Sequence, residues 1–215
     1  MVVDVDKAPP EVSARPVRLA RRLAQLYAGL VLYGVGVALQ VRAGLGLDPW
    51  DVLHQGLARH TGMSFGRTMI AVGAVVLLLW VPLRQRPGIG TVSNAVVIGL
   101  VVDLTLDVVP APSGLAARWP LLLAGVLLGG VATGCYIGAG LGPGPRDGLM
   151  TGLAARTGRS IRLVRTGIEL TVLGAGVLLG GTAGIGTVLY AVAIGPLAHV
   201  FIPLFTLRPA ARPSG

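Results

Sequence analysis

The stretch GLGLDPWDVLHQGLARHTG, Gly44–Gly62, decides the fold, because the chain repeats it 96 residues later as GLGPGPRDGLMTGLAARTG, Gly140–Gly158. Both copies open with Gly-Leu-Gly, continue with Pro-x-Asp and end with Thr-Gly. Closely spaced glycines allow sharp turns, and proline followed by an acid is typical of the start of a helix. The two stretches therefore predict the same loop and short helix in two places.

The likeness between the two parts of the chain extends well beyond this stretch. GIGTV occurs at Gly88–Val92 and again at Gly184–Val188, with the same offset of 96 residues. An ungapped comparison of residues 26–110 with residues 122–206 gives 32 identities in 85 positions. The sequence therefore predicts a duplicated fold.

The composition places this duplicated fold in a membrane. Of the 215 residues, 53% are hydrophobic and 13% are charged, and the mean hydropathy is +0.76. Soluble domains carry roughly a quarter charged residues. The apolar runs lack the alternation of a membrane β-barrel. The net charge of +9 resides in short loops between these runs, which excludes a nucleic-acid-binding domain and favours a role in membrane orientation.

Six apolar stretches are long enough to cross a bilayer. They are residues 23–41, 64–83, 90–109, 119–137, 163–180 and 187–207. The glycine-rich segment Gly180–Thr187 separates the last two. Three spans fall in each of two membrane repeats, residues 18–112 and 113–208. Residues 1–17 and 209–215 are expected to be cytoplasmic tails, the first of them disordered.

An odd number of spans in each repeat makes the second repeat enter the membrane from the opposite side, which is an inverted-topology repeat. With a cytoplasmic N-terminus, 14 of the 18 basic residues fall on the inner side and 4 on the outer side. Cytoplasmic loops carry the excess of basic residues in membrane proteins. We therefore expect an all-α, six-span protein of the plasma membrane with both termini in the cytoplasm.

A short helix is expected after the first span of each repeat, over residues 49–60 and 145–156. Asp48 suits the N-cap, Pro49 the first helical position and Asp51 the third. In the second copy Pro145 and Asp147 hold the corresponding positions. About twelve residues are too few to cross a bilayer. Each short helix is therefore interfacial or re-entrant.

Two roles are open for the polar residues of these helices. Asp51 and Asp147 can simply cap two interfacial helices. Alternatively, both helices line a central cavity, where their ends and acids face a charged group of a solute. In the second case, the substrate-binding candidates are Asp48, Trp50, Asp51, Arg146 and Asp147.

Three further candidates lie inside the apolar stretches. Glu169 marks a functional site or pairs with Arg165 one turn earlier. Asp103 and His199 are repeat mates that can pair at the interface between repeats, carry protons or simply be hydrated. Uncharged polar mates are candidates for solute contacts or interhelical hydrogen bonds. These are Asn94 with Tyr190 and Gln40 with Tyr136.

No enzyme motif occurs in the chain. It has no HExxH, no Cys/His metal cluster, no phosphate-binding GxxxxGK[ST] and no nucleophile elbow. Cys135, the single cysteine, suits packing. We therefore expect neither an enzyme nor a cofactor or metal site.

The GLGxDPWDVLxxGLxxxTG segment, its degenerate second copy and the two GIGTV motifs resemble the bacterial YczE/YyaS/YitT group of small integral membrane proteins. The resemblance covers about residues 20–207. It implies a bacterial plasma-membrane location and a genetic association with pyridoxal-phosphate-dependent regulators, which hints at traffic of small metabolites. It implies no mechanism.

The resulting functional prediction is a secondary transporter of a small polar or zwitterionic metabolite, which works by alternating access between inverted repeats. The alternatives are a non-transporting membrane scaffold or regulatory partner, and a helper for export or assembly of a secreted metabolite. The expected partners are the lipid bilayer and an unidentified small solute, with no nucleic acid. The sequence leaves a homo-oligomer open.

Overall fold

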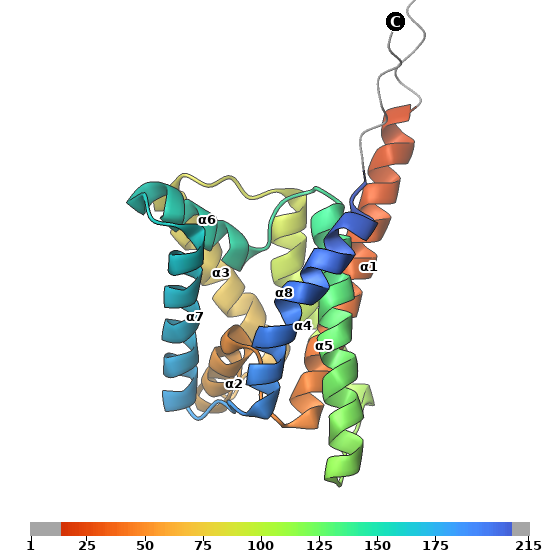
Figure 1. The fold of residues 1–215 in the computed structure, drawn as a ribbon, viewed down its shortest axis with the longest axis vertical. Helices are drawn as coiled ribbons and strands as arrows, with labels where there is room; N and C mark the ends of the chain where they lie inside the picture. The colour runs from red at the N-terminus through yellow and green to blue at the C-terminus, as the bar shows by residue number, and fades with distance from the viewer. Residues whose placement is uncertain (1–13, 208–215) are drawn as a thin grey trace, which may run out of the picture.

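The computed structural model of the protein describes residues 14–207, and within that range it contains eight helices and no strand (Figure 1). The helices are α1 (Ala14–Ala43), α2 (Pro49–Thr61), α3 (Phe65–Leu83), α4 (Ile89–Val108), α5 (Leu115–Gly138), α6 (Pro145–Thr157), α7 (Ile161–Leu178) and α8 (Ile185–Phe205).

Five of these helices are long and apolar enough to cross a membrane: α1 from Leu19 onward, α3, α4, α5 and α8. Their outer faces carry large exposed apolar side chains, such as Leu78 and Leu104, as expected where a helix faces lipid. The chain is therefore an all-α membrane protein with several spans. α7 falls outside these five because its 18 residues include the charged residues Arg162, Arg165 and Glu169.

Each predicted helix is present in the structure, with ends that differ from prediction by a few residues. The largest difference is at α1, which begins at Ala14, inside the segment that we expected to be a disordered tail. Pro16 does not prevent this, because amide groups in the first helical turn have no intrahelical partner to lose. Residues 1–13 of this tail and the expected tail 209–215 lie outside the described residues.

The long helices pack around a central pair. α1 runs along α5, α4 packs against α1, and α8 packs against α5 (Figure 1). The short helices lie toward opposite ends of the molecule in this view, where α2 packs mainly against α7 and α6 against α3. Each short helix thus contacts a long helix from the other half of the chain.

The two short helices begin in the same way. The residues before them, Asp48 and Gly144, have φ/ψ angles of −63°/161° and −62°/159°. Asp48 Oδ1 accepts a hydrogen bond of 2.8 Å from the amide of Asp51, whereas glycine offers α6 no side-chain cap. The predicted helix starts at Pro49 and Pro145 are therefore confirmed, and only α2 has a side-chain cap.

The loops before these helices make reciprocal contacts. The amide of Gly186 in α8 donates to the carbonyl of Leu45 at 2.8 Å, and the amide of Gly90 in α4 donates to the carbonyl of Leu141 at 2.9 Å. Both donors and both acceptors are separated by 96 residues. Each loop is therefore attached to the beginning of a long helix from the other half of the chain.

One pair of corresponding interfaces differs between the halves. α3 packs closely against α4, so that a Cβ atom on Gly66 would lie 1.9 Å from the carbonyl oxygen of Gly99. α7 makes hardly any contact with α8, and a Cβ atom on Gly195 would meet nothing within 4 Å. The two halves of the chain therefore have different arrangements.

Candidate functional site

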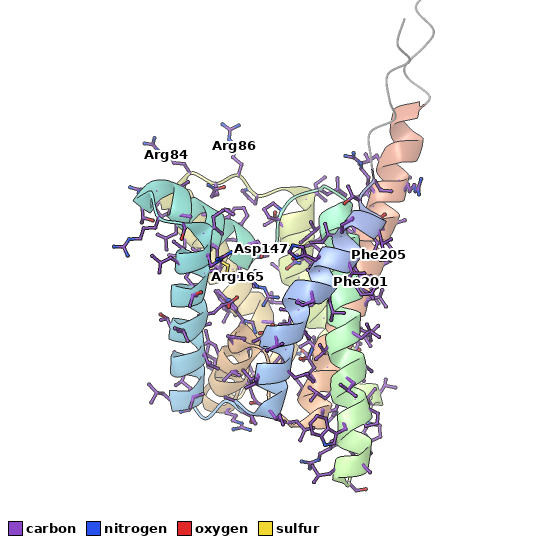
Figure 2. The ribbon with its side chains drawn as sticks, viewed as in Figure 1. Arg84, Arg86, Asp147, Arg165, Phe201 and Phe205 are labelled. Carbon is purple, nitrogen blue, oxygen red and sulfur yellow. The ribbon has the colours of Figure 1, made fainter. Side chains whose placement is uncertain are left out.

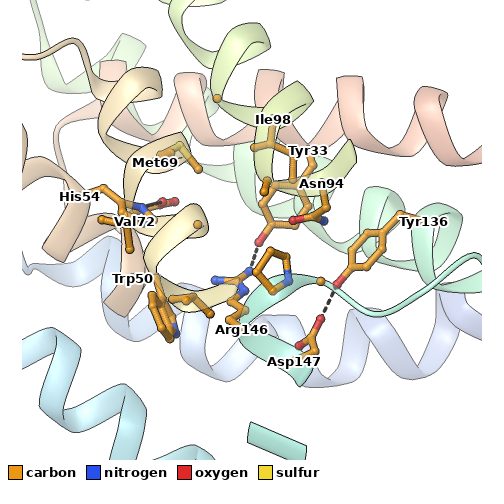
Figure 3. A pocket seen from close by; sticks show the side chains of 17 residues that line it. Tyr33, Trp50, His54, Met69, Val72, Asn94, Ile98, Tyr136, Arg146 and Asp147 are labelled. Atoms are coloured by element: carbon orange, nitrogen blue, oxygen red, sulfur yellow. Dashed lines mark hydrogen bonds and ion pairs between the residues drawn. The ribbon is translucent and has the colours of Figure 1, made fainter. Parts of the chain in front are cut away.

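Two adjoining cavities lie where the short helices approach the long ones. The first, here called the α4-side cavity, has a volume of about 70 Å³ and is lined by α1 to α6 (Figure 3). The second, the α8-side cavity, has a volume of about 170 Å³ and is lined by the start of α2 with α5, α6, α7 and α8. Four residues line both cavities: Trp50, Tyr136, Arg146 and Asp147. These four form the partition between the cavities.

Arg146 connects the two halves of the chain at this partition. Its Nη1 atom lies 3.1 Å from Oδ2 of Asp48. Its Nη2 atom donates to the hydroxyl of Tyr33 (Figure 3). The guanidinium carbon lies 5.7 Å from the centre of the Tyr33 ring, within the range of a cation–π interaction. The Tyr33 hydroxyl is in turn 3.3 Å from that of Tyr190. This network joins α1, α6 and α8 to the N-cap of α2.

Asp147 faces both cavities from the first turn of α6. Its Oδ2 atom accepts a hydrogen bond of 2.9 Å from the hydroxyl of Tyr136 (Figure 3). No basic side chain lies within ion-pair distance of Asp147 among the residues that the structure describes. Asp147 is therefore a carboxylate with a neutral partner at the centre of the site.

Asp51, the repeat mate of Asp147, lines the α4-side cavity and is 4% exposed. Its Oδ1 atom lies 3.0 Å from Nδ1 of the buried His54, whose ring contacts Phe65 edge-on. Loss of water around the carboxyl raises the pKa of Asp51, and the nearby Asp48 raises this pKa further. Asp51 therefore has both a capping position and a place in the cavity wall.

Glu169 lines the α8-side cavity together with Arg165. Arg165 Nε donates to Glu169 Oε1 at 2.8 Å, one turn apart on α7. The side chain of Glu169 is 33% exposed and that of Arg165 is 55% exposed. Glu169 thus has the expected partner and also faces a cavity, and its functional role stays a prediction.

Trp50 contributes the one indole of the site. The side chain is buried, and its Nε1 atom has no hydrogen-bond partner among the described residues. A buried donor without an acceptor is unfavourable by about 1–3 kcal/mol. Because Trp50 lines both cavities, this unpaired donor marks a place where a ligand acceptor would be stabilising.

The structure places Asp103 and His199 outside the site. Asp103 accepts hydrogen bonds from the hydroxyl of Ser64 and from the amide of Gly66, at the beginning of α3. His199 is exposed on α8, with its Nδ1 atom near the carbonyl of Gly195. Asp103 and His199 do not pair in the described part of the chain, because Asp103 is engaged at the beginning of α3.

Two residues of the site were not identified from the sequence. Tyr33 aligns with a glycine, Gly129, in the other repeat. A search for polar residues aligned with polar residues therefore did not identify it. His54 follows Asp51 by three residues, and this spacing on one helix face was the available signal. Among the described residues, no cluster of three His, Cys, Asp or Glu could hold a metal ion.

The comparisons with known proteins agree with the membrane assignment. A protein of Haemophilus influenzae described as uncharacterized is 39% identical over 189 residues, which cover 88% of this chain and 87% of the relative. The uncharacterized membrane protein YczE of Bacillus subtilis is 36% identical over 187 residues, covering 86% of this chain and 87% of the relative.

More distant similarity extends over a comparable length. The uncharacterized protein YyaS of Bacillus subtilis is 28% identical over 180 residues, covering 82% of this chain and 90% of the relative. No solved structure matches the chain. The model of a family of unknown function, DUF6198, matches residues 20–203. The chain therefore belongs to the DUF6198 family and is a YczE/YyaS-like membrane protein, as its duplicated glycine-rich segment predicted.

Proposed function

We propose that this protein is a secondary transporter that moves a small polar or zwitterionic metabolite across the bacterial plasma membrane. The observation that carries the proposal is the pair of adjoining cavities, which share a wall of charged and aromatic side chains. Both halves of the chain contribute to that wall through Arg146 and its partners Asp48 and Tyr33. A movement of one half relative to the other would therefore change access to the bound solute.

Two inverted repeats of three spans provide the means for such a movement. The 96-residue duplication, the matched starts of α2 and α6 and the reciprocal bonds of Leu45 and Leu141 support this architecture. α7 is the sixth span of the proposal. Its 18 residues extend about 27 Å, close to the roughly 30 Å of a hydrocarbon core. The pairing of Arg165 with Glu169 reduces the cost of its charges.

The unequal interfaces support alternating access. In one half, α3 is packed against α4, while in the other the α8-side cavity lies between α7 and α8. In a transporter built from two similar halves, the opposite state has the two arrangements exchanged. The structure then corresponds to one of the two end states.

The proposed orientation places both termini in the cytoplasm. The beginning of α1 and the end of α8 lie at the same end of the molecule (Figure 1). There, Gln25 of α1 donates to the carbonyl of Phe205 at 2.7 Å. Arg84 and Arg86 are at the end where α6 lies (Figure 2). The excess of basic residues in the inner loops supports this side as the cytoplasmic one.

Uptake into proteoliposomes tests the proposal. Purified protein is reconstituted and offered a labelled panel of amino acids, amines and organic acids. We expect at least one of these solutes to enter faster than in protein-free liposomes. Arg146→Gln should reduce this uptake by about tenfold or more, since it removes a charge-assisted contact between the halves. Asp51→Asn and Asp147→Asn should reduce it as well.

Asp107→Asn is the matched control, because Asp107 is an exposed acid of α4 that lines neither cavity. Its uptake should equal that of the unchanged protein. Uptake no faster than in protein-free liposomes across the whole panel contradicts transport and favours a scaffold. Full uptake by a protein truncated to one repeat contradicts alternation between the halves.

A further inference from the structure

The charged side chains around the two cavities are predominantly acidic. Four acids line the cavities, Asp48, Asp51, Asp147 and Glu169, against two arginines, Arg146 and Arg165. With every carboxyl counted as ionised and histidine counted as neutral, the formal net charge of the lining is −2, although the formal charge of the whole chain is +9. An excess of acid in a buried site favours a solute with a positive group over a simple anion.

Two of these acids lack an arginine partner. Arg146 lies 3.1 Å from Asp48 and Arg165 lies 2.8 Å from Glu169. Of the remaining two, Asp51 contacts His54, while Asp147 contacts only the Tyr136 hydroxyl among the described side chains. Asp147 is also the acid without an arginine partner that faces both cavities. It is therefore the best placed to receive a positive group.

Aromatic side chains line the cavities that this carboxylate faces, although the chain is poor in them. Only 5% of the residues are aromatic, and the chain has four tyrosines. Three of these tyrosines, Tyr33, Tyr136 and Tyr190, line the cavities together with Trp50. Aromatic faces attract ammonium groups, and the effect is stronger where water is excluded. Carboxylate and aromatic rings thus point to the same kind of ligand.

Hydrogen-bond donors on the same wall complement the other end of such a ligand. Trp50 Nε1 is buried and has no partner within the described chain. Arg146 stands beside it in the partition, and the N-cap residue of α6, Gly144, offers no side-chain cap. Donors and a helix N-terminus of this kind bind carboxylates.

We propose that the site binds a small α-amino acid, with its ammonium group at Asp147 and its carboxylate at Arg146 and Trp50. This assignment rests on the transport function proposed above and specifies its substrate class. The cavity volumes, about 70 and 170 Å³, are well below the roughly 300–1,000 Å³ of pockets for drug-sized ligands. The amino acid is consequently a small one, and alanine is a suitable probe.

Binding measurements with three related probes test this assignment. Purified protein in lipid nanodiscs is titrated at neutral pH with alanine, ethylamine and propionate, which carry both charges, the positive charge alone and the negative charge alone. We expect alanine to bind most tightly, ethylamine to bind more weakly and propionate not to bind at millimolar concentrations. Propionate binding as tightly as alanine, or no binding by alanine and ethylamine, overturns the assignment.

Two variants separate the two ends of the ligand. Asp147→Asn should weaken both alanine and ethylamine by about tenfold or more, because both depend on the carboxylate. Trp50→Phe should weaken alanine alone, since ethylamine has no group for the indole donor. Asp107→Asn, remote from both cavities, should bind as the unchanged protein does. Unchanged ethylamine affinity in a folded Asp147→Asn protein overturns the assignment.

A folding defect in one variant leaves the test intact, because Tyr136→Phe keeps the carboxylate and removes only its hydroxyl partner. This variant should still prefer alanine and ethylamine over propionate, and loss of that preference counts against Asp147 as the ammonium site. Tight alanine binding without uptake contradicts transport and leaves the amino-acid site standing. Uptake of solutes without an ammonium group, together with no binding of alanine, supports transport and contradicts the amino-acid site.

Discussion

At the scale of single residues, the central feature is a set of carboxylates that the fold holds away from water. Asp48 and Asp51 were recognised from the sequence because capping depends on local spacing, which a linear pattern contains. Tyr33 and Tyr190 come together from helices 157 residues apart in the chain, with their hydroxyls 3.3 Å apart. No local pattern reports such a contact, because it depends on how distant helices pack in three dimensions.

Asp51 should make the stability of the protein depend on pH. Because folding raises the pKa of Asp51 through burial and the proximity of Asp48, the folded protein holds this proton more tightly than the unfolded chain. The resulting stabilisation is complete below the unfolded pKa of about 4 and is lost as the pH rises through the higher folded pKa. The apparent Tm of the protein relative to that of Asp51→Asn should therefore fall from pH 4 upward.

Thermal unfolding of both proteins in the same detergent, followed across this pH range, measures the difference. Asp107→Asn provides the comparison, because it makes the same chemical change at an exposed position. If the Tm of the protein rises relative to that of Asp51→Asn as the pH increases, the change has the wrong sign. That result would show that ionised Asp51 is stabilised in the fold.

At the scale of elements, the duplicated segment has nearly the same backbone in both copies. Gly46 and Gly142 have φ angles of +117° and +125°, and Gly62 and Gly158, which end the short helices, have φ angles of +70° and +66°. The GLG motifs predicted the turns before the short helices, because glycine is the residue that adopts positive φ readily. The motifs did not predict that each loop would contact the other half of the chain.

Gly46→Ala should destabilise the protein more than Gly62→Ala. At Gly46, alanine would adopt an unfavourable φ of +117° and place its Cβ atom 2.7 Å from the backbone nitrogen of Gly184. At Gly62, φ is +70° and nothing lies within 4 Å of the added atom. Strained backbone costs about 1–3 kcal/mol, and a steric clash adds to this at Gly46 only.

The apparent Tm of the two variants in detergent measures this order, and Gly142→Ala should resemble Gly46→Ala because its Cβ atom would lie 2.8 Å from Oγ1 of Thr91. Equal effects of Gly46→Ala and Gly62→Ala would mean that the loop can leave α8 at little cost. The reciprocal attachment of the loops would then contribute little to the fold.

At the scale of the whole molecule, the two halves share a pattern and differ in packing. Sequence comparison aligns Gly66 and Gly73 of α3 with Arg162 and Glu169 of α7. The glycines let α3 approach α4, whereas Glu169 of α7 lines the α8-side cavity. The duplication was predictable from identities along the chain. Which of the two corresponding interfaces packs more closely depends on a balance of packing energies, and identities do not report that balance.

Alternating access predicts that opening one half closes the other. Gly99→Val should force α3 away from α4, because a Cβ atom there would lie 2.5 Å from the carbonyl oxygen of Gly66. The distance between spin labels on α7 and α8, at Leu170 and Val192, should then shorten. Both positions are exposed, and replacement of the single cysteine by Cys135→Ala gives a background suitable for labelling.

The corresponding labels at Ala74 and Val96, 96 residues earlier, should move apart in the same Gly99→Val protein. Gly195→Val is the matched variant: it has open space in the present state, so it should leave both distances unchanged or favour the present arrangement. Pulsed electron paramagnetic resonance measures both distances in nanodiscs. If Gly99→Val separates α3 from α4 while the α7–α8 distance stays constant, the halves move independently. Transport by exchange of their arrangements would then be wrong, even if the cavities bind a solute.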